Sequence, residues 1–397
     1  MSEAGLNITH CGTLQCDVQY TKIEGGDLFE LYCCVRPQRD LGTFAEQVNS
    51  VYEQLLALLA LQGLSPRDLI TERLFCGDIG RQYRELAEIR SRFYQGSGMS
   101  GTELPATSFL EQSPCQSGRL FELQAYALQT HDGYGLEVCV IPGLRAPSSG
   151  KLVRTPGYTQ LYLQNLVGTP EAELADFTDQ CRSMFEQMAV HLHELGAPLS
   201  QLVRTWIYLK DMERDYDALN AVRNRTFKEW KIARLPASTG IQGGTYPPSW
   251  RCAADLYAVW GDARLEIEAM SADTLNEAPA YGSAFSRGLK VVRQDRTILY
   301  VSGTASIDTR GEVVHVDNIE GQVHRMLTNV ESLLSAQGAG FVDAVTVVTY
   351  LKCPAYLQAF ARVCAARGMP QDMPNSVVVA DVCRPEWLCE IELTAVL

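Results

Sequence analysis

Apolar residues recur at helical spacing in three separate stretches of the chain, and the three stretches are alike. Residues 43–63, 176–196 and 318–338 each carry a Gln at the fifth position and end at a Gly. Both markers are displaced by 133 residues between the first and second stretch and by 142 between the second and third. A Gly after the last apolar position is a helix C-cap signal, so each stretch predicts an amphipathic helix. Because the Gln and the Gly are displaced by the same distances, the three stretches indicate an internal repeat.

The segments around each predicted helix repeat in the same order. A hairpin-like stretch precedes the helix, and a buried-strand pattern follows it. A second helix then starts at a tyrosine, and another strand-like segment closes the unit. The buried segments are 69–79, 202–212 and 344–354, the tyrosines are Tyr83, Tyr216 and Tyr356, and the closing segments are 120–128, 251–259 and 388–396. This order of elements therefore predicts three β-β-α-β-α-β-β units.

Two segments rich in turn residues, 142–151 and 271–282, separate the units. They predict units at 1–145, 146–270 and 271–397, the last carrying the candidate chemistry. The fold class is α+β, with one sheet per unit and helices on one face. Period-two alternation leaves a polar row on the other face of the last strand, Leu388, Glu390, Glu392 and Thr394 in the third unit. We expect the three sheets to bury these faces around a shared centre.

Composition narrows the possible partners and the compartment. The 397 residues include 34 Lys plus Arg and 47 Asp plus Glu, a net charge of −13. This argues against nucleic acid as the main partner, because phosphate binding needs a basic surface. No apolar run approaches the roughly 18 residues of a membrane span, and the start MSEAGLNITH does not resemble a secretory signal. We expect a cytoplasmic protein with no membrane partner.

The cysteines and histidines do not predict a metal site. The 13 cysteines include no CxxC pair, and His191 and His193 are two positions apart on a predicted helix, so they point to different faces. In the expected compartment the thiols are reduced. We expect neither a metal nor another cofactor.

Several motifs of the third unit resemble the RidA (YjgF-like) family. They are residues 302–322, the VVTYLK strand at 347–352 and the EIE at 390–392. The resemblance implies a chorismate-mutase-like fold and, because family members are usually homotrimers with clefts between subunits, a pseudo-trimer within one chain. It also implies that the protein is a monomer. The Arg that deaminating members carry in a P-x-R element is replaced in all three units, by Thr107, Ser238 and Ser376.

The second and third units also resemble the chorismatase family. The matching segments are RTWIYL (204–209), with Tyr216, Asn220, Arg223 and Phe227 downstream of it, then LPASTGIQG (235–243), FSRG (285–288), SGTAS (302–306) and CRPEWLCEIE (383–392). This resemblance implies that chorismate is cleaved to pyruvate and either a dihydroxycyclohexadiene carboxylate or 3-hydroxybenzoate. The chain departs from the family in its complete first unit and in residues 308–315, DTRGEVVH, which resemble an ordinary RidA hairpin.

Cleavage of an enol ether needs a carboxylic acid that keeps its proton at neutral pH, and a dicarboxylate substrate needs cations. Glu390 is the candidate acid, because Glu392 lies on the same strand face and a like charge raises a carboxyl pKa. The aligned residues are Glu122 in the first unit and Ala253 in the second. Gln124 and Asp255 replace the second Glu there, so the doublet predicts one active site.

Arg204, in an otherwise apolar strand, and Arg287, before an apolar run, are the candidate cations. Arg223 is expected on a solvated helix face. Tyr350 can donate a hydrogen bond, and the small residues at 302–305 allow a ring to approach the backbone. The remaining candidate substrate-binding residues are Ser302, Gly303, Thr304, Ala305, Cys383, Ser238 and Thr239.

Three interpretations of the function stay open. The first is a chorismatase-like enzyme with Glu390 as general acid. The second is a RidA-fold enzyme that acts on another enol, enamine or ester in a biosynthetic pathway. The third is a module that binds a small carboxylate without turnover. The Glu doublet favours an enzyme, since like charges add nothing to simple binding.

Overall fold

Three six-stranded sheets, each covered by two helices, make up the computed structural model, which describes residues 6–12, 17–38, 41–130, 135–141 and 143–397. The first unit contains β1 Asn7–Cys11, β2 Val18–Gly25, β3 Leu28–Val35, α1 Phe44–Leu61, β4 Leu69–Cys76, α2 Ile79–Gly96, β5 Ala106–Glu111 and β6 Phe121–Thr130. The second contains β7 Glu137–Val140, β8 Ser149–Arg154, β9 Tyr158–Leu166, α3 Phe177–Glu194, β10 Leu202–Leu209, α4 Met212–Glu229, β11 Ala237–Gln242 and β12 Cys252–Gly261. The third contains β13 Glu266–Met270, β14 Gly288–Val292, β15 Thr297–Thr304, α5 Ile319–Ser335, β16 Ala344–Leu351, α6 Leu357–Ala366, β17 Asn375–Val379 and β18 Cys389–Val396.

The strand order is the same in all three sheets. It is β1-β2-β3-β6-β4-β5 in the first unit, and the corresponding strands follow that order in the second and third. The last two strands of the order, β4 and β5 in the first unit, pair in parallel because the second helix connects them, while the other pairs are antiparallel. The α+β class and the three tandem RidA-like units are confirmed.

Each unit contains one more strand than the sequence predicts. The edge strands β1, β7 and β13 pair with the strand that follows them, so each unit is β-β-β-α-β-α-β-β. β7 and β13 precede the boundaries expected at 145/146 and 270/271, yet they belong to the second and third sheets. These strands are short and mostly exposed, and so they lack the apolar pattern by which a buried strand is recognised.

The Gln that marks each first helix has one structural role in all three units. Gln47 Oε1 accepts a hydrogen bond from Leu120 N at 2.7 Å, and its Nε2 donates to the Gly118 carbonyl at 2.8 Å. Gln180 and Gln322 make the same pair of bonds to the segments before β12 and β18. A buried polar side chain is retained when its hydrogen bonds are satisfied. The Gln therefore fixes the helix to the last strand of its sheet.

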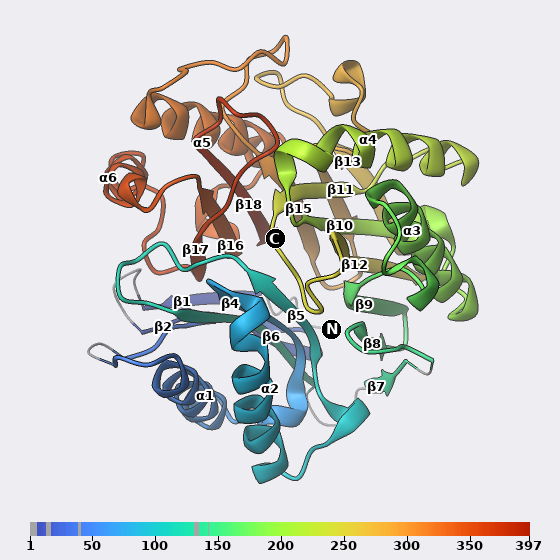
Figure 1. Cartoon of the computed structure of the whole chain (residues 1–397), viewed down its shortest axis with the longest axis vertical. Helices are drawn as coiled ribbons and strands as arrows, with labels where there is room; N and C mark the ends of the chain where they lie inside the picture. The colour runs from blue at the N-terminus through green and yellow to red at the C-terminus, as the bar shows by residue number, and fades with distance from the viewer. Residues whose placement is uncertain (1–5, 13–16, 39–40, 131–134, 142) are drawn as a thin grey trace.

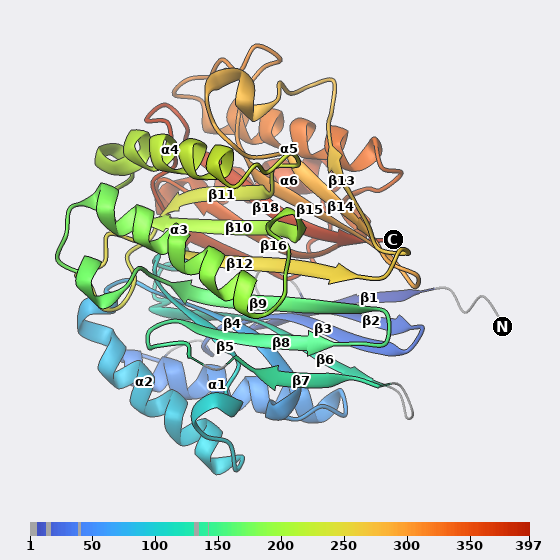
Figure 2. The same ribbon diagram turned by 90° about the vertical axis from the view of Figure 1, so that its right-hand side faces the viewer.

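The helix pairs lie on the outside, and the three sheets turn their other faces toward a common centre (Figures 1 and 2). Along β18, Ile391 and Leu393 pack in the apolar core with α5, while Glu390, Glu392 and Thr394 alternate with them and face the centre. The expected pseudo-threefold packing of polar rows is confirmed.

Tyrosine rings fill much of the centre. Tyr32 stacks on Tyr126 with 4.7 Å between ring centroids, and Tyr126 lies 5.9 Å from Tyr162. Tyr162, Tyr257 and Tyr300 continue the series at 5.0 and 5.2 Å. Because these rings come from all three sheets, aromatic packing joins the units into one body. No helix of the described chain is long and apolar enough to cross a membrane.

Candidate functional site

A cleft of about 330 Å³ lies between the second and third units. Helix α4 and strand β11 form one wall, and the ends of β15 and β18 with the loops beside them form the other. Its lining residues are Tyr216, Asp217, Asn220, Arg223, Ser238, Gly240, Gly282, Ser283, Phe285, Arg287, Gly303, Ala305, Ile307, Cys383, Arg384, Trp387 and Glu390. Acidic, basic and aromatic side chains thus converge on one space.

Glu390 is the carboxyl that distinguishes this cleft. It lies on β18 opposite Tyr350 of β16, is 3% exposed and lines the cavity. Burial, and then the negative charge of Glu392, raise the pKa of Glu390 to about 8, although Arg204 and Arg287 act in the opposite direction. At neutral pH this carboxyl therefore holds its proton and can act as an acid.

Gly303 leaves the space that the carboxyl occupies. A Cβ at this position would lie 2.0 Å from Glu390 Oε1, so only glycine fits beside the side chain as it stands. The Gly303 amide donates to Thr239 Oγ1 at 2.9 Å, which ties the end of β15 to β11 of the second unit. Gly303 thus makes room for the Glu390 side chain, and the approach of a ring to residues 302–305 stays a prediction.

Three arginines line the same cleft. Arg287 donates to the Asn276 carbonyl at 2.7 Å and to its Oδ1 at 3.1 Å. Arg223 donates to Asn220 Oδ1 at 2.6 Å, and Arg384 donates to the Gly311 carbonyl at 2.7 Å. Amide oxygens orient a guanidinium without removing its charge, so these side chains can bind an anionic ligand.

Aromatic rings stand next to these cations. The guanidinium carbons of Arg223 and Arg287 lie 5.4 and 5.6 Å from the Phe285 ring centroid, and that of Arg384 lies 5.0 Å from the Trp387 ring. Rings at this distance stabilise a cation and offer a flat apolar surface. The cleft combines sites for carboxylates with a surface for a ring.

Cys383 lines the cleft as an uncharged thiol. Burial raises its pKa to about 12, and a hydrogen bond with Tyr216 opposes that shift. A thiol with so high a pKa is a poor nucleophile, so the geometry supports a role in shaping the pocket rather than covalent chemistry. Among the described residues no three His, Cys, Asp or Glu side chains group as metal ligands.

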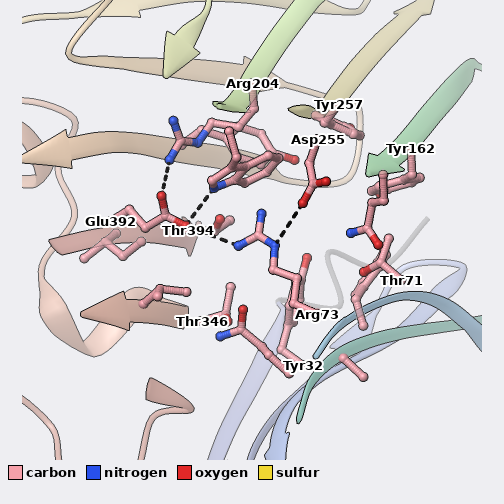
Figure 3. A pocket seen from close by; sticks show the side chains of 18 of the residues that line it. Tyr32, Thr71, Arg73, Tyr162, Arg204, Asp255, Tyr257, Thr346, Glu392 and Thr394 are labelled. Atoms are coloured by element: carbon pink, nitrogen blue, oxygen red, sulfur yellow. Dashed lines mark hydrogen bonds and ion pairs between the residues drawn. The ribbon is translucent and has the colours of Figure 1, made fainter. Parts of the chain in front are cut away.

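The other half of the predicted acid pair lies at the molecular centre. Glu392 Oε2 accepts from Arg204 Nη2 at 2.8 Å, and its Oε1 accepts from Trp206 Nε1 at 2.7 Å and from Arg73 Nη1 at 3.2 Å (Figure 3). Glu392 and Arg204 line a separate central cavity of about 100 Å³, together with the tyrosine rings. Neither is among the residues that line the cleft.

Comparison with known proteins places the chain in a family. The family model described as Endoribonuclease L-PSP matches residues 163–270 and 276–397. The chain belongs to the Endoribonuclease L-PSP family. A RutC family protein of Saccharolobus solfataricus is 32% identical over 120 residues, which is 30% of this chain and 90% of the relative. The RidA resemblance of the sequence is thereby confirmed.

Two solved structures illustrate what this L-PSP family chain is similar to. A crystal structure of a chorismatase matches it with a TM-score of 0.60 and 17% identity, over 92% of this chain and 98% of the other. RidA from an Antarctic Psychrobacter species matches with 18% identity and a TM-score of 0.28, over 33% of this chain and 99% of its own. The chorismatase match shows a shared fold along nearly the whole chain.

The structure distributes the remaining predicted residues of this L-PSP family member over two roles. Gly303, Ala305, Ser238, Arg287 and Cys383 line the cleft. Ser302, Thr304, Thr239 and Tyr350 stand behind its surface. Ser302 Oγ donates to the Ser286 carbonyl at 2.6 Å and accepts from Ser238 N at 2.9 Å, which joins the second unit to the third.

Sequence reasoning misplaced one cleft residue and assigned no site role to several others. Arg223 was expected on a solvated face but is 2% exposed and lines the cleft, because that face of α4 packs against the third unit. The chorismatase resemblance names Tyr216, Asn220 and Arg223 downstream of RTWIYL without giving them a site role. Their spacings of four and three place them on one helix face, a signal that could have assigned all three to the cleft. Phe285, Arg384 and Trp387 lie in the FSRG and CRPEWLCEIE segments, but the sequence patterns assign them no individual role.

Proposed function

We propose that the cleft between the second and third units is the active site of a chorismatase-like enzyme. Its substrate is chorismate or a related cyclic enolpyruvyl ether with two carboxylates. The observation that carries the proposal is the Glu390 carboxyl, buried in a cleft that three arginines line, where burial raises its pKa to about 8. The fold shared with a chorismatase supports the same function.

The proposed reaction begins with proton transfer from Glu390 to the terminal methylene carbon of the enolpyruvyl group. The C=C electrons form the new C–H bond, and the positive charge that results is shared with the ether oxygen. Water then adds to the carbon that bears the ether oxygen, which carries the positive charge, and gives up a proton to the Glu390 carboxylate. This addition forms a hemiketal. The hemiketal bond to the ring oxygen then breaks as the hemiketal hydroxyl becomes the carbonyl of pyruvate. The departing ring oxygen takes a proton from Glu390, and the hemiketal hydroxyl returns one to it, so pyruvate and the dihydroxycyclohexadiene carboxylate leave and Glu390 is restored.

Attack by the neighbouring hydroxyl of the ring in place of water, with its proton passing to Glu390, forms a cyclic ketal. Breaking the ring C–O bond of that attacking oxygen and the ketal bond to the ether oxygen, with loss of the proton on the ring carbon that bears the ether oxygen, releases pyruvate and 3-hydroxybenzoate.

The arginines and aromatic rings supply binding in this proposal. A guanidinium can hold a carboxylate through two charge-assisted hydrogen bonds, and three guanidiniums suffice for two carboxylates. Phe285 and Trp387 give the ring an apolar surface. Ser238, at a position of the missing P-x-R arginine, offers one neutral hydroxyl instead. A three-carbon imine would lose that contact, which argues against RidA-type deamination.

The direct test is to incubate the purified protein with chorismate and to measure pyruvate by a coupled lactate dehydrogenase assay. We expect pyruvate to form with the wild-type chain and not with Glu390→Gln. Intact chorismate after long incubation, together with its tight binding by calorimetry, would overturn the enzyme and favour a carboxylate-binding module. Turnover of another enol ether but not of chorismate would favour a different RidA-fold enzyme.

A further inference from the structure

A charged cluster at the centre of the molecule connects all three units and lies behind Glu390. Glu392 and Glu390 are two residues apart on β18, so they point from the same face of the third sheet. The second unit binds Glu392 through Arg204 and Trp206, and the first unit binds it through Arg73 (Figure 3).

The charges of this cluster are balanced among themselves. Arg73 reaches Glu392 at 3.2 Å and Asp255 of β12 at 3.6 Å. Asp255 also accepts hydrogen bonds from Tyr208 at 2.9 Å and from Ser108 at 2.6 Å. The side chains of Arg204, Asp255 and Glu392 are at most 5% exposed, and that of Arg73 is 11% exposed. Poor screening by solvent makes each charge felt by its neighbours.

We propose that Glu392 and Arg73 are positioning residues that fix the protonation state of Glu390. The first unit, which supplies none of the described residues that line the cleft, would then take part in the reaction across the pseudo-threefold axis. This inference rests on the proposed role of Glu390 as a proton donor.

The charges around Glu390 shift its pKa in opposite directions. The negative charge of Glu392 raises the pKa of Glu390, and the positive charge of Arg204 lowers it. Arg73 partly neutralises Glu392, so it weakens the effect of Glu392 on Glu390. The other titratable groups that face Glu390 stay the same in the variants below. They are Arg287, Tyr350, Cys383 and Cys389, and, around the cleft, Tyr216, Asp217, Arg223 and Arg384.

Two substitutions therefore shift the Glu390 titration in opposite directions. Glu392→Gln removes the like charge and leaves Arg204 without its carboxylate, so the pKa of Glu390 falls. Arg73→Met leaves Glu392 charged, because Arg204 and Trp206 still bind it, so the pKa of Glu390 rises. Arg73→Lys keeps the charge and is the matched control. A loss of packing alone would not shift the two variants in opposite directions.

The experiment measures kcat/KM for chorismate against pH. We expect the decline in rate at high pH to move to lower pH in Glu392→Gln, by about one unit or more, and to higher pH in Arg73→Met. One unit corresponds to about a tenfold loss of rate at a fixed pH above the decline. Arg73→Lys should follow the wild type. If both Glu392→Gln and Arg73→Met turn over chorismate and their rates decline at the same pH as that of the wild type, this inference is overturned. The proposed function would then still stand.

A second readout does not require turnover. The infrared carbonyl band of the protonated Glu390 carboxyl, assigned by its loss in Glu390→Gln, can be titrated in the unliganded protein. Opposite shifts of this titration in Glu392→Gln and Arg73→Met would support the inference even if chorismate is not a substrate. A titration that is the same in both variants and the wild type would overturn it.

Discussion

The same strand position carries a glutamate in the first and third units, and its surroundings differ. Glu122 of β6 is bound by Arg36 Nε at 3.2 Å and accepts from the Cys34 thiol at 2.9 Å. No described residue donates a hydrogen bond to Glu390, which instead lines an open cleft. The ion pair and the thiol make the Glu122 carboxyl a structural group. The Glu390 carboxyl has no such partner among the described residues, so it remains available to act on a ligand in the cleft.

The difference comes from two neighbouring positions. The strand registers place Gly303 and Ala305 of the third unit where the first unit has Cys34 and Arg36. Arg36 fills the space beside Glu122 and also donates to the Asn375 carbonyl of the third unit at 2.5 Å. Small residues at both positions keep the space beside Glu390 open. A glutamate at this strand position is therefore not enough to make an active site. The residues beside it determine whether its carboxyl is bound by protein groups or lines an open cleft.

The largest expected effect separates the two glutamates. Glu390→Gln should lower turnover by about 10²- to 10⁴-fold, the contribution of a general acid, with little loss of stability. Glu122→Gln should retain turnover and lose about 3 kcal/mol of stability, because Arg36 is left buried without its carboxylate. Pyruvate release and urea denaturation measure the two quantities. Equal loss of turnover in both variants would contradict a single active site.

The next effect tests the open space beside Glu390. Gly303→Ala puts a methyl group where Glu390 Oε1 lies, so the carboxyl must move, and we expect kcat to fall by about 10- to 100-fold. Cys34→Ala, at the matching position of the first unit, should leave kcat unchanged and cost about 1 kcal/mol. Unchanged kcat in Gly303→Ala would show that the position of the carboxyl does not matter.

A smaller effect concerns substrate binding on α4. Arg223→Gln should raise the KM for chorismate by about tenfold or more through the loss of one charged contact to a carboxylate. Arg225→Gln is the matched control on the same helix, because the Arg225 side chain is 75% exposed and pairs with Glu229 at the surface. If both substitutions raise KM equally, Arg223 does not contact the substrate.

The pH dependence of stability gives a test that needs no substrate. The raised pKa of Glu390 means that the folded chain holds this proton more tightly than the unfolded chain. The resulting stabilisation is present below the unfolded pKa of about 4.5 and is lost as pH rises to about 8. Thermal unfolding of the wild type should therefore show a decline over this window that is weaker in Glu390→Gln. Parallel curves for the two proteins would contradict a protonated Glu390.

The last prediction concerns the assembly state of the wild-type chain. Arg36 and Asn375 join the first unit to the third, so the ring of three units is closed within one chain. We expect light scattering to give the mass of one chain, 44.0 kDa, over the concentration range of the assays. A stable assembly of three chains would show that these contacts form between molecules instead.

Local periodicity and markers such as Gln322 and Gly338 were enough to predict the repeat, the helices and the alternation of the last strands. The sequence also singled out Glu390 and Gly303. Only the packing of the three units shows that Arg204 and Glu392 pair at the centre and that Arg223 lines the cleft. These residues meet across unit boundaries, and the local pattern of one strand or helix carries no information about what another unit packs against it. The edge strands were missed for a related reason, since their pairing comes from a neighbouring strand rather than from burial of their own side chains.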